Sequence, residues 1–499
     1  MRFSEKKKGI NVITNYEGEK AWKLSPKMEL YTLVCTASLQ KKFYTNADEC
    51  ITRLRKLIKK VPVEFVAQLA VYAREQMYLR SIPLVLVVEL CKVCNNSQLI
   101  EDTSYRVIQR ADELVEILAY YQQANNRTGT KKLNKLHNGL KKGIARAFGK
   151  FNEYSFAKYN RDTEVKLRDA MFLTHPKPDE DKVELFKKIA DDKLETPDTW
   201  EVELSKNDGV SKKTKWERLI EEDKLGYMAQ LRNLRNMLGS DVQNLGKVLN
   251  NLSDKEAVAK SRQLPFRFFS AFREITGVGN FKSTGVLDCL EEAIKASIEN
   301  IPGFDYNTNV LIACDMSGSM QTPLSVKSSI SYYEIGIVLG MLLQYKCKSV
   351  MTGIFGEAWK IKNLPKGNIL ENTLGISNMI GEVGHSTNGY LAIKWLIENK
   401  QIADKVFVFT DCQLWDSQGY DLNGRWSDFT FADEWKKYKK IAPNAKLYMI
   451  DLAGYGNTPI DLSNKDVYMI AGWSDKIFQV LDSLEKGENS LYEIEKIKI

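Results

Sequence analysis

The feature of this sequence that most constrains its fold is a change in hydrophobic period near residue 305. From about residue 20 to residue 300, apolar residues recur at intervals of three and four, which is the spacing of a helix that buries one face. After "ENIPGFDYNTN", short continuous apolar runs alternate with amphipathic segments. The chain therefore combines two fold classes, because helical and strand periods specify different elements.

The first part of the chain predicts helices. In "VPVEFVAQLAVYAREQMY", Pro62 stands where a helix would begin, and Val63, Val66 and Ala70 follow at helical spacing. Strand signals are nearly absent up to residue 300, so we expect helices of about 10 to 20 residues joined by short polar links. Such a series is typical of a helical solenoid of antiparallel pairs.

The second part alternates strands and helices. The runs "VLIACD", "SVMTGIFG", "KVFVFTD", "AKLYMIDLAG" and "DVYMIAG" predict strands, and amphipathic segments separate them. This alternation predicts a doubly wound α/β domain. We therefore predict three regions: an N-terminal extension over residues 1–20, an all-α domain over 21–304 and an α/β domain over 305–499.

Nothing in the sequence indicates a membrane or secreted protein. No apolar run approaches the roughly 20 residues of a membrane helix, and the polar N-terminus has no apolar signal region. Six of the eight cysteines are scattered singly, as expected for free thiols in a reducing compartment. Cys91 and Cys94 form a lone CxxC with no histidine nearby in sequence, which favours core packing over zinc. We expect a soluble cytoplasmic protein.

The positive charge is concentrated in one segment. Residues 127 to 168 contain twelve Lys or Arg against three acids, whereas the whole chain has a net charge of +8. Within it, Leu133, Leu136, Leu140, Ile144, Ala147, Phe148 and Phe151 form an apolar stripe beside a face rich in lysine. No acid interrupts this face before Glu153, so a phosphate backbone explains it better than a solvated face, which normally mixes both signs.

A candidate metal site follows the first strand of the α/β domain, in "CDMSGSM". Ligands of open α/β sheets bind beyond the carboxyl ends of the strands, where Asp411 also lies and where Thr387 precedes a helix. Oxygen ligands with two acids suit Mg²⁺, with Ca²⁺ or Mn²⁺ as alternatives. The expected ligands are Asp315, Ser317, Ser319, Thr387 and Asp411.

Two other interpretations of this turn are less favoured. Ser317 and Ser319 could merely cap the next helix while Asp315 orders the turn. Ser317 could instead be a nucleophile, but it lies outside a G-x-S-x-G elbow, and the sequence gives no reason to place His385 beside it as a base. We expect no catalytic residue.

Both parts of the chain resemble known families. "DMSGSM" with Thr387 and "FTDCQLW" resembles the metal-ion-dependent adhesion (MIDAS) motif of von Willebrand factor A domains, in which serine, threonine and acidic residues hold an ion and a partner supplies the last ligand. The basic segment, with "TPDTWEVELSK", "KWERLIEEDKLGYMAQLRNLRNML" and "LPFRFFSAFR", is similar to the TROVE module of the Ro ribonucleoprotein family. The two modules in this order resemble Ro proteins, and we expect a bacterial or phage member.

The resemblance implies a monomeric ring of HEAT-like repeats closed by the A domain. It implies binding of small noncoding Y-like RNA on an outer basic surface, and of single-stranded ends of misfolded or structured RNA through a central hole. Onto this sequence it maps the basic segment, with His137 and His175 either packed or in contact with RNA. The expected contacts are Lys131, Lys132, Lys135, His137, Lys141, Lys142, Arg146, Lys150, Lys158, Arg161, Lys166, Arg168, His175 and Lys177, with Arg232 and Arg235 for the hole.

Three functional hypotheses remain open at this point. The first is a non-catalytic RNA-binding protein in RNA quality control, with an exoribonuclease as a further partner and without DNA binding. The second is a divalent-metal-dependent protein-interaction module on a structural helical scaffold. The third is an enzyme such as a nuclease, which the hydroxyl-rich ligand set and the missing base disfavour.

Overall fold

In a computed structural model, the structure describes residues 12–37, 45, 47–127, 135–160, 163–195, 199–278, 283–298, 308–325, 328–415, 417–420, 426–485 and 487–499. The chain divides into two compact units. The sheet unit consists of Met1–Ile51, Tyr227–Gly239 and Gly246–Tyr492, and the helical unit consists of Thr52–Gly226, Ser240–Leu245 and Glu493–Ile499.

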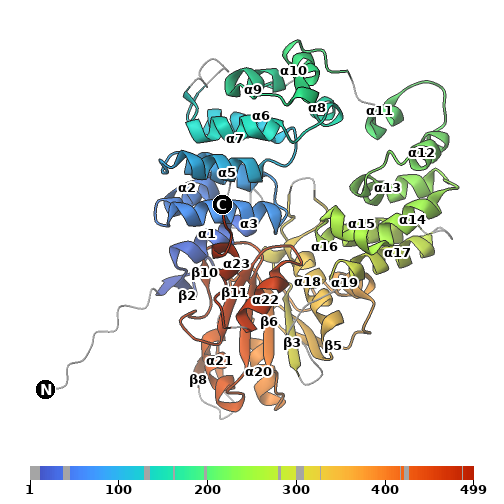
Figure 1. Cartoon of the computed structure of the whole chain (residues 1–499). Coiled ribbons are helices and arrows are strands. Elements are labelled where there is room, and N and C mark those ends of the chain that lie inside the picture. The colour runs from blue at the N-terminus through green and yellow to red at the C-terminus, as the bar shows by residue number, and fades with distance from the viewer. Residues whose placement is uncertain are drawn as a thin grey trace. The chain divides into compact units, whose positions relative to one another are not determined.

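The helical unit is built from stacked helices, as its sequence period predicts. Helix α3 packs on α5, α5 on α7 and α7 on α9, while α4 packs on α3 and α6 (Figure 1). The helices of this part are α2 (Ala47–Ile58), α3 (Val63–Glu75), α4 (Ser81–Leu90), α5 (Ser97–Val107), α6 (Glu113–Ala124), α7 (Asn138–Phe148), α8 (Glu153–Tyr159), α9 (Leu167–Thr174), α10 (Val183–Ala190), α11 (Trp200–Ser205) and α12 (Lys212–Glu221). Among the residues described here, the unit contains no strand.

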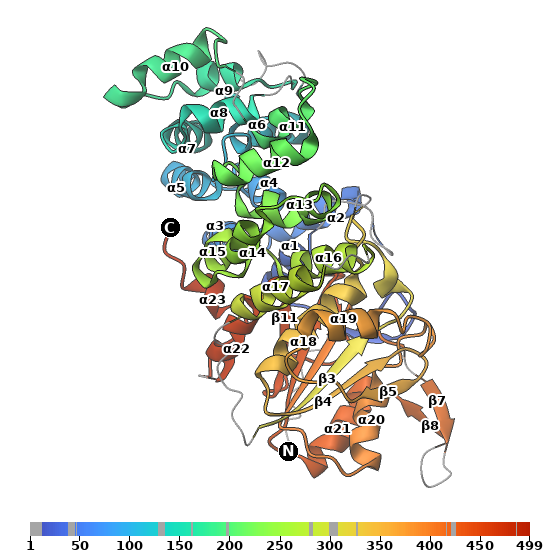
Figure 2. The same ribbon diagram turned by 90° about the vertical axis from the view of Figure 1, so that its right-hand side faces the viewer.

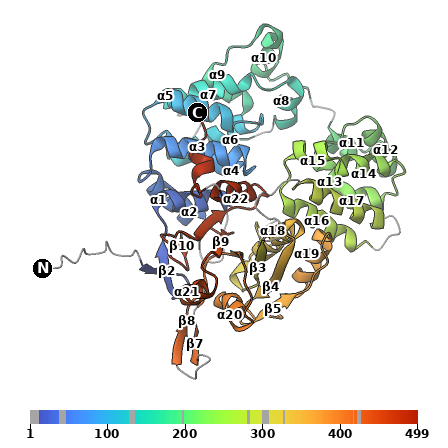
Figure 3. The same cartoon turned by 60° about the horizontal axis from the view of Figure 1, so that its bottom comes forward.

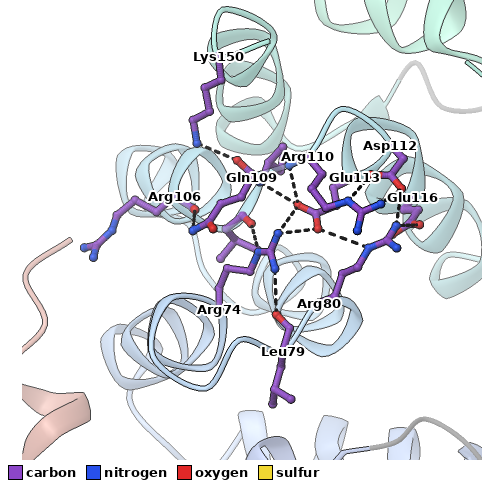
Figure 4. Close-up of polar contacts among 12 residues, drawn as sticks. Arg74, Leu79, Arg80, Arg106, Gln109, Arg110, Asp112, Glu113, Glu116 and Lys150 are labelled. Atoms are coloured by element: carbon purple, nitrogen blue, oxygen red, sulfur yellow. Dashed lines mark hydrogen bonds and ion pairs between the residues drawn. The ribbon is translucent and has the colours of Figure 1, made fainter. Parts of the chain in front are cut away.

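A buried ion-pair network fixes the turn between α5 and α6 (Figure 4). The Arg74 guanidinium donates to both carboxylate oxygens of Glu113, at 2.7 and 3.0 Å, and to the carbonyl oxygens of Val107 and Leu79. Glu113 also accepts a hydrogen bond from the backbone N–H of Gln109. Because both charged groups are buried, either one alone would be an uncompensated charge, so the pair specifies how these helices meet.

The sheet unit contains the predicted α/β domain. Its six-stranded sheet has the order β11-β9-β6-β3-β4-β5 and is parallel except for β5, which pairs antiparallel with β4. The sheet strands are β3 (Asn309–Asp315), β4 (Ser349–Phe355), β5 (Trp359–Lys362), β6 (Lys405–Thr410), β9 (Lys446–Asp451) and β11 (Val467–Ala471). The hairpin β7 (Ser417–Tyr420) and β8 (Trp426–Phe429) forms a separate two-stranded sheet.

Helices cover both faces of this sheet, which explains why its strands are apolar throughout. Helix α18 (Tyr332–Lys346) lies close on one face (Figure 2). Cβ atoms at Gly336 and Gly340 would approach Phe409, Ile312 and Cys314 within 3.3 Å. The other face packs on α20 (Tyr390–Glu398) and α21 (Phe431–Ile441) in one apolar cluster. Helices α19 (Ile369–Ser377) and α22 (Ile477–Glu485) complete the domain.

The last helices before the α/β domain pack against it. Helix α16 contacts α18 and α19, and α17 contacts α19. Arg273 of α16 pairs with Glu334 of α18, and the Glu291 carboxylate of α17 accepts backbone N–H groups at the start of α19. Packing assigns the last helices of the helical part to the sheet unit. They are α13 (Tyr227–Gly239), α14 (Leu245–Ser253), α15 (Lys255–Ser261), α16 (Pro265–Thr276) and α17 (Ser283–Ala296). The packing units therefore do not follow the change in period.

The segment predicted as an N-terminal extension forms an ordered ribbon where it is described. Strands β1 (Val12–Thr14) and β2 (Lys20–Lys23) pair antiparallel, and β2 also pairs with β10 (Asn457–Thr458) near the other end of the chain (Figure 3). Helix α1 (Pro26–Cys35) follows, and the Tyr31 hydroxyl bonds to the backbone of Ala471. The period of the sequence did not indicate these strands because they are only three and four residues long.

Two expectations about the chain can be compared with the fold. Among the described residues, no helix combines the length and apolarity needed to cross a membrane. All eight cysteines are free thiols. Cys94 is buried in the turn that follows α4, Cys91 is half-buried, and burial raises the pKa of the Cys91 thiol to about 12.

Candidate cation site and basic surface

The five predicted cation ligands gather at the carboxyl edge of the sheet. Strands β3 and β6 are neighbours, and Cys314 lies opposite Phe409. Asp315, at the end of β3, and Asp411, directly after β6, therefore lie close together at this edge. Thr387 comes three residues before α20, and its hydroxyl donates to the carbonyl oxygen of Gln413, in the loop that carries Asp411. All five side chains are buried.

Asp315 orders the turn that carries the two serines. One of its oxygens accepts the backbone N–H of Ser317 at 2.9 Å, and the other accepts the Thr410 hydroxyl at 2.6 Å. The hydroxyl oxygens of Ser317 and Ser319 lie 3.4 Å apart. Asp315 therefore orders the turn, as the alternative interpretation expected, but neither serine caps the short helix Ser319–Gln321, which begins after Gly318 without a side-chain cap, and the two hydroxyls lie together.

Asp411 is the residue whose environment points most directly to a cation. One of its oxygens accepts the backbone N–H of Gln413 at 3.0 Å, while Oδ2 is buried and accepts no hydrogen bond. Burial, and then the negative charge of Asp315, raise the pKa of Asp411 to about 8, although the Ser319 hydroxyl opposes this rise. Burial also raises the pKa of Asp315 to about 6.

These residues fit a divalent cation by their chemistry. Two carboxylates lie in a buried site, close enough for the charge of Asp315 to raise the pKa of Asp411, and within the described part of the chain neither pairs with a Lys, Arg or His. No group of three or more His, Cys, Asp or Glu suitable for a metal occurs among those residues, so a cation here would depend on the hydroxyls of Ser317, Ser319 and Thr387. Hard oxygen ligands of this kind suit Mg²⁺.

In the described part of the chain, His385 does not lie as a base for Ser317. The His385 ring nitrogen Nδ1 lies 3.0 Å from the Gln321 side-chain amide, whereas the Ser317 hydroxyl contacts Ser319. A nucleophilic serine needs a base within hydrogen-bonding distance.

Helix α7 presents lysines on one face and packs the other on α5. Its buried residues include Leu140, Ile144, Ala147 and Phe148 of the predicted stripe. Phe151 is also buried and Leu136 is half-buried, while Leu133 lies outside the described residues. Lys142 is exposed and Lys141 half-exposed, and neither forms an ion pair among the residues described. The apolar stripe thus places these two lysines toward solvent.

The structure gives two of the predicted contacts internal partners. Arg146 pairs with Asp102 at 2.7 Å and lies 4.0 Å over the Tyr105 ring. Lys150 donates to the carbonyl oxygens of Tyr105 and Ile108 at the end of α5, where helix carbonyls lack intrahelical partners. Burial of its amine, and then the charge of Arg146, lower the pKa of Lys150 to about 8. Both residues brace α7 against α5.

Basic and aromatic side chains alternate farther along, on α8 and α9. Arg168 lies 5.5 Å over the ring of Phe172, a phenylalanine that is 52% exposed. His175 follows in the left-handed conformation (φ 52°) that ends α9, and it is exposed. Lys158 approaches the ring of Tyr154, which is 47% exposed. Exposed rings beside cations are the features with which proteins stack single-stranded bases.

The remaining predicted RNA contacts have varied positions. His137 caps the start of α7 through its ring nitrogen, which accepts the backbone N–H of Gly139 at 3.1 Å. Lys166 precedes α9 within its capping box. Lys135, Lys166 and Lys177 are exposed, whereas Lys131, Lys132 and Arg161 lie outside the described residues.

Arg232 and Arg235 line a pocket of about 600 Å³ between α13, α16 and the residues Leu324, Ser325 and Ser328. Arg235 pairs with Glu274 at 2.8 Å. Arg232 instead faces Arg267, whose pKa is lowered by burial and then by the charge of Arg232. Within the described part of the chain, neither Arg232 nor Arg267 pairs with a carboxylate. Sequence reasoning missed Arg267 because only folding brings α16 to the pocket that Arg232 of α13 also lines.

The α/β domain with its hydroxyl-rich acidic turn defines this chain as a protein with an A domain. The stacked helices before it form a helical repeat region. The sequence matches the TROVE domain over residues 17–192 and 188–283 and the Ro60 vWA domain over residues 309–484. The chain therefore belongs to the TROVE-domain family of Ro proteins, with a C-terminal von Willebrand factor A domain. Proteins of this family are RNA-binding components of ribonucleoproteins and are generally non-catalytic.

Comparisons with individual proteins agree with this assignment. The fold is similar to that of the crystal structure of the Deinococcus radiodurans RO (RSR) protein, with a TM-score of 0.58 and 17% identity over 95% of this chain and 100% of that one. Telomerase protein component 1 is 45% identical over 85 residues in Mus musculus and 44% identical over 81 in Rattus norvegicus. These matches span 17% and 16% of this chain and 3% of each relative.

Proposed function

We propose that this chain is a non-catalytic RNA-binding protein of the cytoplasm that holds a small noncoding Y-like RNA on the basic surface of its helical unit. By the basic surface we mean the exposed residues Lys135, Lys142, Arg168, His175 and Lys177, together with the half-exposed Lys141. We propose that it also captures single-stranded ends of misfolded or structured RNA and presents them to an exoribonuclease.

The observation that carries the proposal is the unpaired state of Lys141 and Lys142. Within the described residues these lysines have no acidic partner, whereas Arg146 on the same helix is neutralised by Asp102. Unpaired lysines on one face attract a polyanion, and binding releases the counterions of its phosphates. The exposed ring of Phe172 beside Arg168 adds a surface on which an unpaired base can stack.

The arginine pocket supports capture of single strands. Arg232 and Arg267 line the same pocket, the charge of Arg232 lowers the pKa of Arg267, and neither pairs with a carboxylate among the described residues, so a bound anion would be favourable here. A phosphate group accepts hydrogen bonds from the fork of a guanidinium, so a nucleic-acid backbone suits the pocket. That this pocket belongs to a central hole stays a prediction from the family resemblance.

A divalent cation at the acidic turn, most suitably Mg²⁺, would give the A domain a separate role. The residues that would hold it are Asp315, Ser317, Ser319, Thr387 and Asp411, and the ion would supply an open coordination position for a partner's carboxylate. Because neutral hydroxyls dominate this set, it suits capture of a ligand better than activation of water. A metal-dependent protein-interaction module is therefore the alternative function, and it can coexist with RNA binding.

The test is a binding experiment with two RNA probes, a stable stem-loop and an unstructured oligonucleotide, on the full chain at matched salt. We expect Lys141→Gln/Lys142→Gln to weaken stem-loop binding ~tenfold and to reduce its salt dependence, because phosphate contacts are lost. Arg232→Gln/Arg267→Gln should instead weaken binding of the unstructured oligonucleotide. Arg146 is left unchanged because its removal would also break its pair with Asp102.

The matched control is Lys59→Gln/Lys60→Gln, which removes two adjacent exposed lysines at the end of α2. It should bind both probes like the parent. Equal losses in this control and in the Lys141→Gln/Lys142→Gln protein would show a general charge effect and would reject the basic surface as the binding site.

A further inference from the structure

Gln413 is a buried glutamine two residues after the predicted ligand Asp411, and all its side-chain hydrogen-bonding groups have partners. Its Nε2 donates to the Asn457 Oδ1 at 3.0 Å and to the Asp411 carbonyl oxygen at 3.4 Å. Its Oε1 accepts the backbone N–H of Tyr16 at 3.0 Å and lies 3.5 Å from the Asn457 Nδ2. A fully satisfied buried amide holds its surroundings in one arrangement, because losing any partner leaves a costly unpaired group.

The backbone of the same residue touches two predicted cation ligands. The Gln413 N–H donates to the Asp411 carboxylate at 3.0 Å, and the Gln413 carbonyl oxygen accepts the Thr387 hydroxyl at 2.8 Å. A small movement of Gln413 would therefore displace a carboxylate and a hydroxyl together.

The partners of this loop come from the start of the chain. Asn15 donates from Nδ2 to the carbonyl oxygen of Leu414 at 2.8 Å, and Tyr16 donates to Gln413. Asn15 also closes the turn of its own ribbon, since Oδ1 accepts the backbone N–H groups of Glu17 and Glu19. The ribbon is fixed from the other side by the pairing of β2 with β10, to which Asn457 belongs.

The loop itself needs this support because its backbone is strained. Cys412 has φ 64°, a left-handed conformation that is uncommon for residues with a side chain. Such conformations persist only where surrounding contacts hold them, and they occur at ligand sites. One of those contacts is the hydrogen bond from the Cys412 N–H to the Thr410 hydroxyl, which itself donates to Asp315.

We propose that the N-terminal ribbon, residues 12–23, is a positioning element for the cation site, acting through Asn15 and Gln413 to hold Asp411 and Thr387 in ligating geometry. The inference rests on the proposed cation site and adds that the affinity of this site for a divalent cation depends on a segment almost 400 residues away in the sequence. Asn15 and Gln413 are positioning residues and do not touch the ion.

The variant that tests this idea is Asn15→Asp. An aspartate keeps the oxygen that closes the ribbon turn, and it replaces the donor to the Leu414 carbonyl by a carboxylate oxygen, whose negative charge repels that carbonyl. The matched control is Asn399→Asp, because Asn399 also donates from its side chain to a backbone carbonyl, that of Trp395 at 2.9 Å, at the end of α20 and apart from the loop. Gln413→Leu removes the side-chain amide that bonds to Tyr16 and Asn457. Asp411→Ala removes a predicted cation ligand.

The probe is Mn²⁺, titrated into the full chain and followed by electron paramagnetic resonance. We expect the wild type to bind, Asp411→Ala to lose binding, and Asn15→Asp and Gln413→Leu to bind roughly tenfold more weakly, which is the usual scale for residues that orient metal ligands. Asn399→Asp should bind like the wild type. In the metal-free proteins, hydrogen–deuterium exchange of the peptide around residues 405–415 should rise in Asn15→Asp and stay unchanged in Asn399→Asp.

The outcomes separate the inference from the proposed site. If Asp411→Ala loses Mn²⁺ while Asn15→Asp and Gln413→Leu bind it like the wild type, the cation site stands and the positioning role is wrong. If the wild type does not bind Mn²⁺, or if Asp411→Ala still binds it, the cation site and the inference fall together. Unchanged exchange in Asn15→Asp would also overturn the positioning role, independently of any metal.

Discussion

At the scale of single residues, the two buried carboxylates of the α/β domain dominate the chemistry. Asp411 has an ordinary pKa of 3.8 that is raised to about 8, and its Oδ2 atom accepts no hydrogen bond. A folded state that raises the pKa of an acid binds more protons than the unfolded chain between these two values. Without a cation, the contribution of protonated Asp411 to the stability of the domain is therefore lost as pH rises from about 4 to about 8.

A bound divalent cation should reverse this pH dependence, because it replaces the protons on the two acids. We predict that excess Mg²⁺ raises the melting temperature little at about pH 5.5 and much more at about pH 8.5. At a Mg²⁺ concentration of 100 times Kd the gain corresponds to roughly 2.7 kcal/mol. Thermal unfolding at both pH values measures it.

The control for this prediction is Asp411→Asn, which removes the titrating group with little change of shape. Its melting temperature should respond weakly to Mg²⁺ at either pH. A response in this variant as large as in the wild type would locate the stabilising ion elsewhere.

At the scale of elements, the contact between α5 and α7 decides where the basic face points. Gly139 and Gly143 lie one turn apart on α7 and face α5. A Cβ atom at Gly143 would lie 2.5 Å from the Cβ of Ser104 and 2.7 Å from the carbonyl oxygen of Glu101. The two helices can approach this closely only because these positions lack side chains, and the opposite face of α7 then carries Lys141 and Lys142.

We predict that Gly143→Ala destabilises the protein by about 1–3 kcal/mol, because the added methyl group overpacks the helix contact. Alanine's higher helix propensity would otherwise stabilise this position. Urea unfolding followed by circular dichroism measures the change.

Gly375 in α19 provides the comparison, because a Cβ atom there would meet no heavy atom within 4 Å. Gly375→Ala should stabilise the protein by roughly 0.5–1 kcal/mol. If both substitutions change stability in the same direction, close packing at Gly143 is not the cause.

At the scale of the whole molecule, stem-loop binding on the basic surface and cation binding use different parts of the chain. The basic surface belongs to the helical unit, and the cation site belongs to the sheet unit. Screening by salt acts strongly on exposed lysines and only weakly on buried carboxylates. RNA binding should therefore depend steeply on salt and little on the cation.

We predict that Asp315→Ala, if folded, binds a stem-loop RNA with unchanged affinity and an unchanged salt slope, and that chelation of divalent ions has no effect beyond ionic strength. Filter binding across a salt series measures both quantities, with circular dichroism to verify folding. A tenfold loss of RNA affinity in the folded variant would show that the sites are coupled.

Much of the architecture could be predicted from the sequence. The change in period located the helical part and the α/β part, and the runs from "VLIACD" to "DVYMIAG" became β3, β4, β6, β9 and β11. The short antiparallel strand β5 and the ribbon β1–β2 were not predicted. A few residues carry too little periodicity to identify a strand, and their pairing is set by partners distant in sequence.

What the sequence by itself determined is the kind of side chain available at each site: acids and hydroxyls after buried strands, and lysines on one face of a helix. Those properties follow from local spacing, because strand ends and helix faces are local. Only the tertiary structure decided which of these groups are free to act. It pairs Arg146 with Asp102, brings Arg267 to Arg232, and fastens the Asp411 loop to Asn15, since charge neutralisation and hydrogen bonding depend on residues that folding alone brings together.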